Sequence, residues 1–474
     1  MGTFLSRARV WVDMAFGTAT CNPFGLSLSK PSCLTANGAW RSLRWLAALL
    51  ASGSAAAAAL PDLPLFVGRP APGLSVDIAD MEGHAVLDTA TVTTVPKPDR
   101  PRVPASRVQA RRITKDGDGE ALQLQWQDAW YAAIRLDSAA PLDLRPYLAD
   151  GTLEFQVRSD DLSRTGLNIA MSCGPDCGRK VNHVVASRAL AGKGWQRLSF
   201  ALACFQRDGA DFSRVSRPFV LETSGNGSVE VANVRIVASG KPNTQCPDYR
   251  SQSVTPTPLE EIWALDWWMP RHQAKLKAIA ELHAAGRTAD VVFIGDSITQ
   301  GWENVGQPVW ERSFKAYNAL ALGYGGDRTE NVLWRLQHGE LDGIRPKVVV
   351  LMIGTNNTGD RQEDPATTAA GIRRLIDEIQ VRQPAAQVLL LAIFPRDKQP
   401  DGRLRQLNQR VNKIIAGFAD GRRVHFLDLG PALTNPDGTL SEDILPDLLH
   451  LSEAGYERWA RGIEPTLRTL MAPR

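Results

Sequence analysis

Apolar and polar residues alternate with a period of two through the first half of the chain, from about Val76 to Ser239. Such alternation is typical of β-strands with one buried face. Clusters of Gly, Asp and Asn, which favour turns, separate the alternating runs. Short strands at this spacing predict an antiparallel β-sandwich over residues 76–239. The clearest alternating sets are Leu122, Leu124 and Trp126; Leu153, Phe155 and Val157; and Leu167, Ile169 and Met171.

The pattern changes in the second half, where short apolar runs no longer alternate with polar residues, as is typical of strands buried on both faces of a sheet. Amphipathic segments lie between these runs, and strands that alternate with helices predict a parallel sheet covered on both sides, over residues 263–474. Residues 240–262, rich in Pro, Ser and Thr, are predicted to form a linker. The strand-like runs are Val291–Ile294, Val348–Ile353, Val388–Ile393 and Val424–Leu427, and the helical segments are Arg328–Gln337, Thr367–Arg382, Arg403–Phe418 and Ser452–Leu470.

Residues 1–59 are predicted to be an N-terminal extension that carries an export signal. Trp45–Leu60 is apolar, follows Arg41 and Arg44, and ends in the run Ala55–Ala59, which offers small residues to a signal peptidase. The segment is short for a membrane-spanning helix, which needs about 20 residues. We therefore expect a cleaved signal peptide and a periplasmic or extracellular protein. An uncleaved signal anchor, which would be the protein's one link to a membrane, is the alternative.

The charge of the chain argues against one class of partner. The 474 residues include 54 Lys and Arg against 51 Asp and Glu, for a formal net charge of +3. Five of the basic residues and one of the acidic residues lie in the first 59, so the remainder carries a net charge of −1. Nucleic-acid binding depends on a basic surface that neutralises phosphates. The sequence therefore predicts no nucleic-acid partner, and it leaves the oligomeric state open.

Four of the six cysteines lie beyond the predicted signal: Cys173, Cys177, Cys204 and Cys246. An even number of cysteines in an exported chain favours disulfides. Four cysteines allow three pairings. Cys173 and Cys177 are close enough along the chain to bridge a turn, which would leave Cys204 and Cys246 as the second pair. A zinc site is the alternative.

Polar residues follow the predicted parallel strands. Because ligands of such sheets bind beyond the carboxyl ends of the strands, these residues are candidates for chemistry. Ser297 follows the first run, the glycine cluster Gly323–Asp327 comes next, and Asn356 follows the run Val348–Ile353. Asp447 and His450, three residues apart, could place a carboxylate against an imidazole. Taken singly, each motif has a structural alternative. Ser297 could be a helix cap, the glycine cluster a tight turn and Asn356 part of an Asx turn, and a spacing of three between Asp and His is common and unspecific.

Together, the four segments resemble the SGNH (GDSL-type) hydrolases over residues 289–472. The closest branch resembles the catalytic subunits of intracellular platelet-activating-factor acetylhydrolase. The broad family carries Asp where this chain has Asn357, whereas the closer branch also carries Asn. The resemblance implies an α/β/α flavodoxin-like fold with a five-stranded parallel sheet. It rests on Val292–Ser297, Gly325–Asp327, Val332–Leu336, Arg345–Lys347, Gly354–Asn357 and Leu449–Ser452.

The same resemblance implies a role for each candidate residue. Ser297 would be the nucleophile and His450 its base and later acid, with Asp447 orienting the imidazole ring. The Ser297 N–H, the Gly326 N–H and the Asn356 side chain would form the oxyanion hole. Such a site requires no metal and no cofactor.

The first half resembles the galactose-binding-like β-sandwich of some bacterial family 3 glucan glucohydrolases, which implies a carbohydrate-facing accessory module. Trp130 and Trp195 are the candidates for sugar binding, because flat aromatic faces suit sugar rings. Trp126, at an alternating position, is expected in the sandwich core. The resemblance rests on Ala121–Trp126, Asp143–Arg145, Gly151–Phe155, Cys173–Cys177 and Gly194–Trp195.

The sequence thus predicts a multidomain protein, a galactose-binding-like β-sandwich followed by an SGNH hydrolase. We expect an exported serine ester hydrolase that removes O-acetyl or other short acyl groups from a carbohydrate. One alternative is an acetylhydrolase or lysophospholipase that acts on a lipid ester, and another is a non-catalytic glycan-binding protein. His338 and His425 are expected to be structural. Trp263, Trp267 and Trp268, which precede a helix expected near Arg271, are expected to clamp the two domains or to pack on the hydrolase.

Overall fold

The computed structural model describes residues 59–81, 83–87, 91–94, 106–115, 119–174, 177–207 and 210–472. The predicted signal peptide lies, up to residue 58, outside the described residues. Residues 58–474 belong to one unit of the chain. Among the described residues, no helix combines the length and apolar character needed to cross a membrane.

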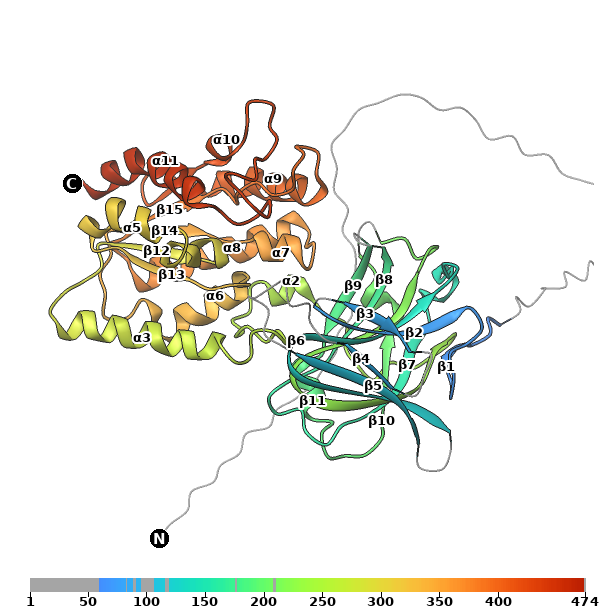
Figure 1. Ribbon diagram of the computed structural model, residues 1–474. Coiled ribbons are helices and arrows are strands. Elements are labelled where there is room, and N and C mark those ends of the chain that lie inside the picture. The colour runs from blue at the N-terminus through green and yellow to red at the C-terminus, as the bar shows by residue number, and fades with distance from the viewer. Residues whose placement is uncertain are drawn as a thin grey trace, which may run out of the picture. The chain divides into compact units, whose positions relative to one another are not determined.

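The first half folds into antiparallel strands that form one bent, branched sheet (Figure 1). The strands are β1 (Leu63–Phe66), β2 (Leu74–Asp80), β3 (His84–Val86), β4 (Thr91–Thr94), β5 (Arg107–Thr114), β6 (Glu120–Ser138), β7 (Thr152–Arg158), β8 (Asn168–Gly174), β9 (Cys177–Asn182), β10 (Gln196–Ala201) and β11 (Arg217–Val237). A short α-helix, α1 (Val184–Arg188), lies between β9 and β10.

Two long strands, β6 and β11, join the layers of the sandwich. β6 pairs with β5 through its first half and with β2 through its second half. β11 pairs with β8 near its start and with β7 near its end, and its pairing with β6 shifts register around Gly225. Such irregularities bend a strand, so one strand can serve both layers. The alternating residues form one buried core, which confirms the predicted sandwich; among them are Leu122, Leu124, Trp126, Leu153, Phe155 and Val157.

The second half contains a parallel sheet of five strands in the order β13-β12-β14-β15-β16. This is the flavodoxin-like order, so the predicted fold is confirmed. The strands are β12 (Val291–Gly295), β13 (Leu320–Gly323), β14 (Val348–Met352), β15 (Gln387–Leu391) and β16 (Val424–Leu427). The helices are α2 (Tyr249–Gln252), α3 (Trp268–Ala284), α4 (Ser297–Gln300), α5 (Gln307–Ser313), α6 (Thr329–Arg335), α7 (Thr355–Gly359), α8 (Pro365–Arg382), α9 (Arg403–Ile415), α10 (Gly430–Leu433) and α11 (Glu453–Met471).

Successive residues of these strands point to opposite faces, and a separate apolar cluster covers each face. Val292 and Ile294 of β12 pack in one cluster with residues of α3, α6, α8 and α9. Val291 and Phe293 pack in the other cluster with residues of α5 and α11. Figure 1 shows α3 and α11 on opposite sides of the sheet. The strands are therefore buried on both faces, as their unbroken apolar runs predict.

Two details of the second half differ from the predicted pattern. β13 is only four residues long, and its sequence, Leu-Ala-Leu-Gly, is too short to stand out as a run. Helix α3 begins at Trp268, three residues before the expected position near Arg271. Trp268, the first residue of α3, donates its indole N–H to buried Asp327, 59 residues away in the sequence.

Both expected disulfides are present. Cys173–Cys177 joins the neighbouring ends of β8 and β9. Cys204–Cys246 ties the segment after β11 back to the sandwich. The pairing predicted from the spacing is confirmed.

The two disulfides are expected to differ in how much they stabilise the fold. They close sequence separations of 42 and 4 residues. Loop-closure entropy predicts that Cys204→Ala/Cys246→Ala lowers the free energy of unfolding by about 4 kcal/mol, and Cys173→Ala/Cys177→Ala by about 2 kcal/mol. Urea unfolding of the two double variants measures both values. Equal losses would contradict the expectation.

Candidate active site

Ser297 is the first residue of α4, directly after β12. Its Oγ lies 2.8 Å from Nε2 of His450. The turn before it needs Gly295, because a Cβ there would overlap the Thr299 hydroxyl and the Met352 carbonyl oxygen. Asp296 caps α4 by accepting a hydrogen bond from the Ile298 N–H, 3.0 Å away. Burial raises the pKa of Asp296 to about 6.

His450 and Asp447 lie on the loop before α11. Asp447 Oδ2 lies 2.6 Å from Nδ1 of His450, and Oδ1 accepts the backbone N–H groups of Leu449 and His450. Burial opposes ionisation of Asp447, but these hydrogen bonds outweigh it and hold the pKa of its carboxyl below the usual range. An ionised Asp447 keeps the proton on Nδ1, which leaves Nε2 free to accept the Ser297 proton. The structure thus brings the three predicted catalytic residues into one hydrogen-bonded series.

The two other loops of the site follow the strands that flank β12. Gly326 follows β13 and has φ +75°, a conformation that favours glycine. Asn356 lies in the first turn of α7, after β14. Its Nδ2 donates to the backbone carbonyl of Asp327, 2.9 Å away, which joins the two loops. The amide has a second hydrogen that it can donate to a substrate oxygen.

A fully buried ion pair between Asp327 and Arg335 stabilises the loop that carries Gly326. Asp327 accepts hydrogen bonds from Trp268 Nε1 at 2.6 Å and from Arg335 Nε at 2.7 Å. Arg335 also pairs with Glu340, to which Tyr324 donates its hydroxyl. Burial raises the pKa of Asp327 to about 7, although Arg335 and Trp268 act in the opposite direction. This support could not be predicted from the sequence, although Arg335 lies in the segment Val332–Leu336, which resembles the SGNH hydrolases.

Asn357 stands at the position where the broad family carries Asp, and its side chain forms hydrogen bonds within the hydrolase half and with the segment before it. Asn357 is fully buried. Its Oδ1 accepts the Thr329 N–H at 3.2 Å, and its Nδ2 lies 3.1 Å from Glu363 and 3.4 Å from Ser253. Asn357 therefore joins α6, α7 and the segment after α2.

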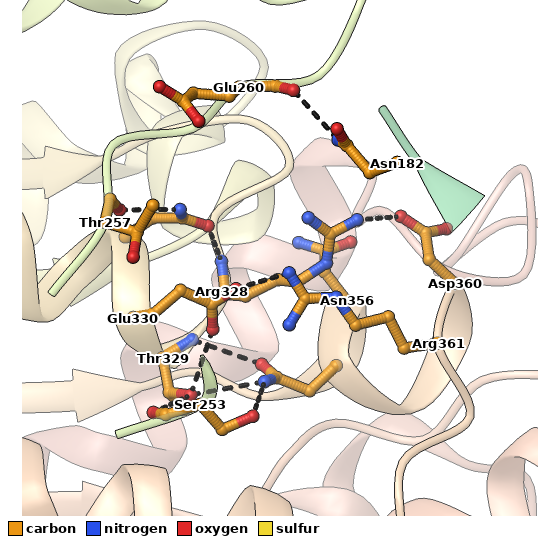
Figure 2. A network of polar contacts seen from close by, with 12 residues as sticks. Asn182, Ser253, Thr257, Glu260, Arg328, Thr329, Glu330, Asn356, Asp360 and Arg361 are labelled. Atoms are coloured by element: carbon orange, nitrogen blue, oxygen red, sulfur yellow. Dashed lines mark hydrogen bonds and ion pairs between the residues drawn. The ribbon is translucent and has the colours of Figure 1, made fainter. Parts of the chain in front are cut away.

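A second network connects the sandwich to the hydrolase half. Glu261 pairs with Lys180 of β9 at 3.3 Å and with Arg328 at 3.0 Å. Figure 2 shows Arg328 reaching Asp360, 2.8 Å away, and Asn182 of β9 donating to the Glu260 carbonyl. Burial would raise the pKa of Glu261, but Lys180 and Arg328 outweigh it and lower that pKa to about 2. Arg328 is two residues from Gly326, so the network reaches the edge of the active site.

The candidate sugar-binding residues differ in exposure. Trp130 is 56% exposed. Trp195 is half-buried, with Lys115 at 5.2 Å and Arg158 at 5.0 Å from its ring centroid. Trp126 is buried and donates its Nε1 proton to the Ser224 carbonyl, as expected for a core residue.

The two histidines expected to be structural, His338 and His425, each have a hydrogen-bond partner. His338 Nδ1 lies 2.7 Å from the Trp334 carbonyl oxygen, and His425 Nε2 lies 2.9 Å from Oε1 of Gln387. Within the part of the chain that the structure describes, no group of three or more His, Cys, Asp or Glu residues is arranged to hold a metal ion.

Comparison with known proteins gives a match for each half. Residues 293–458 match the GDSL-like lipase/acylhydrolase family, and residues 86–236 match a galactose-binding domain-like family. Platelet-activating factor acetylhydrolase IB subunit alpha1 of Pongo abelii is 39% identical over 218 residues, which are 46% of this chain and 90% of that protein.

Two solved structures are similar to separate halves. A GDSL-like lipase from Bacteroides thetaiotaomicron has 21% identity and a TM-score of 0.35, covering 41% of this chain and 98% of that one. The extra C-terminal domain of an exo-1,3/1,4-β-glucanase from a Pseudoalteromonas species has 20% identity and a TM-score of 0.31, covering 39% of this chain and 96% of that one.

The Glu261 network makes a testable contribution to stability. Because the pKa of Glu261 is lower in the folded protein than in the unfolded chain, its charge stabilises the fold above about pH 4.5, and this contribution is lost as the pH falls toward 2. We expect Glu261→Gln to lower the free energy of unfolding by on the order of 3 kcal/mol at pH 7, and by less at pH 3. Urea unfolding between these pH values measures the difference.

Glu442→Gln is the matched control for this prediction. Glu442 also pairs with a lysine at 3.3 Å, but both partners are more than half exposed. An exposed pair contributes about 0–1 kcal/mol, so this variant is expected to remain close to the parent protein. A Glu261→Gln difference that stays constant from pH 7 to pH 3 would contradict the assignment.

Proposed function

The chain belongs to the GDSL-like lipase/acylhydrolase family, and we propose that it is an exported serine ester hydrolase that removes O-acetyl groups from a carbohydrate. The observation that carries this proposal is the hydrogen-bonded series from Ser297 through His450 to Asp447, with separations of 2.8 and 2.6 Å. This arrangement matches the geometry that a serine nucleophile needs.

In the proposed reaction, His450 Nε2 takes the Ser297 proton while Oγ attacks the acyl carbonyl carbon. The resulting oxyanion accepts hydrogen bonds from the Ser297 N–H, the Gly326 N–H and the Asn356 amide. As the bond between the acyl carbon and the sugar oxygen breaks, His450 gives its proton to that oxygen, which leaves as a hydroxyl, and an acyl-serine remains. A water molecule, deprotonated by His450, releases acetate and restores Ser297. Asp447 stabilises the imidazolium in both steps.

Three features support a carbohydrate substrate. Residues 86–236 match a galactose-binding domain-like family. Trp130 on this sandwich is exposed and offers a flat apolar face. Ser297 and His450 are themselves only half-buried, which leaves room for a bulky alcohol on one side of the ester. Export is part of the proposal because of the apolar, alanine-rich segment Trp45–Leu60.

A lipid ester is the second candidate. The relatives at 34–39% identity are platelet-activating factor acetylhydrolase subunits, whose names indicate an acetyl group on a phospholipid. Both candidates share the acyl transfer and differ in the alcohol released. A purely glycan-binding role is disfavoured, because a protein that only binds glycans would not need the hydrogen bonds that connect Ser297, His450 and Asp447.

The Ser297→Ala variant tests the chemistry. We expect its kcat to fall by about 10³- to 10⁶-fold, because the remaining groups bind and polarise the ester without a nucleophile. Initial rates on acetylated xylo-oligosaccharide, an O-acetyl sialic acid and a short-chain acetyl phospholipid measure the loss and identify the alcohol. Turnover at the parent rate would remove the role of Ser297, and activity on the phospholipid alone would replace the carbohydrate proposal with the lipid one.

A comparison of two adjacent asparagines tests the oxyanion hole. Asn356→Ala is expected to lower kcat by about 10²- to 10³-fold, since an oxyanion donor acts mainly in the transition state. Asn357→Ala is expected to act mainly through stability, because Asn357 contacts Glu363, Ser253 and Thr329. Rates and urea unfolding of both variants separate the effects. A normal kcat in Asn356→Ala would exclude its amide from the oxyanion hole.

A further inference from the structure

Trp263 lies directly against the glycine proposed to donate to the oxyanion. A Cβ built on Gly326 would overlap Cη2 of Trp263 and stand 2.8 Å from its Cζ2. The outer edge of the indole therefore contacts the backbone of this loop. Position 326 must be glycine both for this contact and for its φ of +75°.

Trp263 remains exposed although it is held in place. It is 39% exposed, whereas Trp268 is fully buried. Trp267 stacks on Trp263 with ring centroids 6.0 Å apart and an interplanar angle of 26°, and its Nε1 donates to the Trp263 carbonyl at 3.0 Å. A Cβ built on Gly325 would lie 3.4 Å from Cη2 of Trp267. The two indoles thus present one aromatic surface beside the Gly325–Gly326 turn.

The residues before Trp263 are fixed from both halves of the protein. Glu261 pairs with Lys180 of the sandwich and with Arg328 of the hydrolase half. The Ile262 carbonyl accepts the Ser224 hydroxyl of β11, 2.5 Å away. A tryptophan fixed in this way and left exposed is suited to contact a ligand, because its position is set before binding.

A polar cleft is lined by residues that are close in sequence to Trp263 and to Gly326. Its lining includes Glu260 and Glu261, just before Trp263, and Arg328, just after Gly326. Asn182, at the end of β9, and Asp360 also line it, and both are drawn in Figure 2. Sugar rings combine apolar C–H faces with hydroxyl edges, which match an aromatic face next to amide and carboxylate groups.

We propose that Trp263 is a specificity-determining residue that stacks on the sugar ring carrying the acyl ester; this inference rests on the proposed function. The acyl group lies at Ser297, and the ring extends over the indole toward the polar cleft. A choline headgroup is the competing ligand. It is disfavoured because quaternary ammonium ions are bound by aromatic cages, whereas Trp263 and Trp267 stack on each other.

The experiment compares two acetyl esters that differ only in the alcohol: mono-O-acetyl methyl β-xylopyranoside and methyl acetate. The readout is the ratio of kcat/KM for the sugar ester to that for methyl acetate. Loss of one stacking contact is expected to lower this ratio by about 5- to 30-fold in Trp263→Ala, mainly through KM. Trp263→Phe, which retains an aromatic face, is expected to recover most of the ratio. Ile414→Ala is the control, because Ile414 is 38% exposed and lies on α9, which carries none of the proposed catalytic or oxyanion residues.

A double-mutant cycle tests the contact itself. Gly326→Ala forces a Cβ into the Trp263 ring, so its kcat/KM on methyl acetate is expected to fall less in the Trp263→Ala background than in the parent. Equal losses in both backgrounds would show that Trp263 does not contact the backbone of Gly326.

The outcomes for the inference and for the proposed function are distinguishable. If no ester is hydrolysed, the proposed function fails. If methyl acetate is hydrolysed but the ratio is unchanged in Trp263→Ala, the inference fails while the esterase remains. If only an acetylated phosphocholine loses rate in Trp263→Ala, the aromatic surface binds a quaternary ammonium and the sugar assignment is overturned.

Discussion

The buried carboxylate of Asp327 is the point on which the site depends. Its side chain accepts from Trp268, at the start of α3, and from Arg335 of α6, while its backbone carbonyl accepts from Asn356. Three elements therefore fix the loop that carries Gly326. A buried charge without such partners is costly, so the carboxylate, the indole and the guanidinium require one another. The Gly326 N–H and the Asn356 amide, which are the proposed oxyanion donors, are positioned by this arrangement.

The segment between the two halves does more than connect them. Cys246 anchors it to the sandwich, and Ser253 accepts the Thr329 hydroxyl with its carbonyl. Further along, Glu261 pairs with a cation from each half. These contacts fix the path of the chain up to Trp263, so residues of the sandwich contribute to the position of this aromatic ring.

Most of the fold and the central residues of the site could be predicted from the sequence. Unbroken apolar runs identify strands such as Val348–Met352, and Ser297 and Asn356 follow such runs at the strand ends where ligands bind. His450 lies on the loop before α11, and the sequence identifies it by its spacing from Asp447 and by the family resemblance. The supporting contacts could not be predicted, because their partners are far apart: Trp268 from Asp327 by 59 residues and Lys180 from Glu261 by 81. An aromatic residue near the start of a helix has the same sequence signature whether it is buried, as Trp268 is, or exposed, as Trp263 is.

The network around Glu261 links the stability of the hydrolase half to residues that precede it in the chain. A catalytic fragment that starts at residue 263 would retain Ser297, Asn356 and His450, yet Arg328 would lose one of its two carboxylate partners. Ser253, whose hydroxyl donates to Glu363 inside the hydrolase half, would be missing as well. An independently folding esterase would therefore have to begin upstream of α2, and even then Glu261 would lack Lys180. The sandwich and the hydrolase half follow one another in the chain, but Glu261 pairs with a cation from each of them.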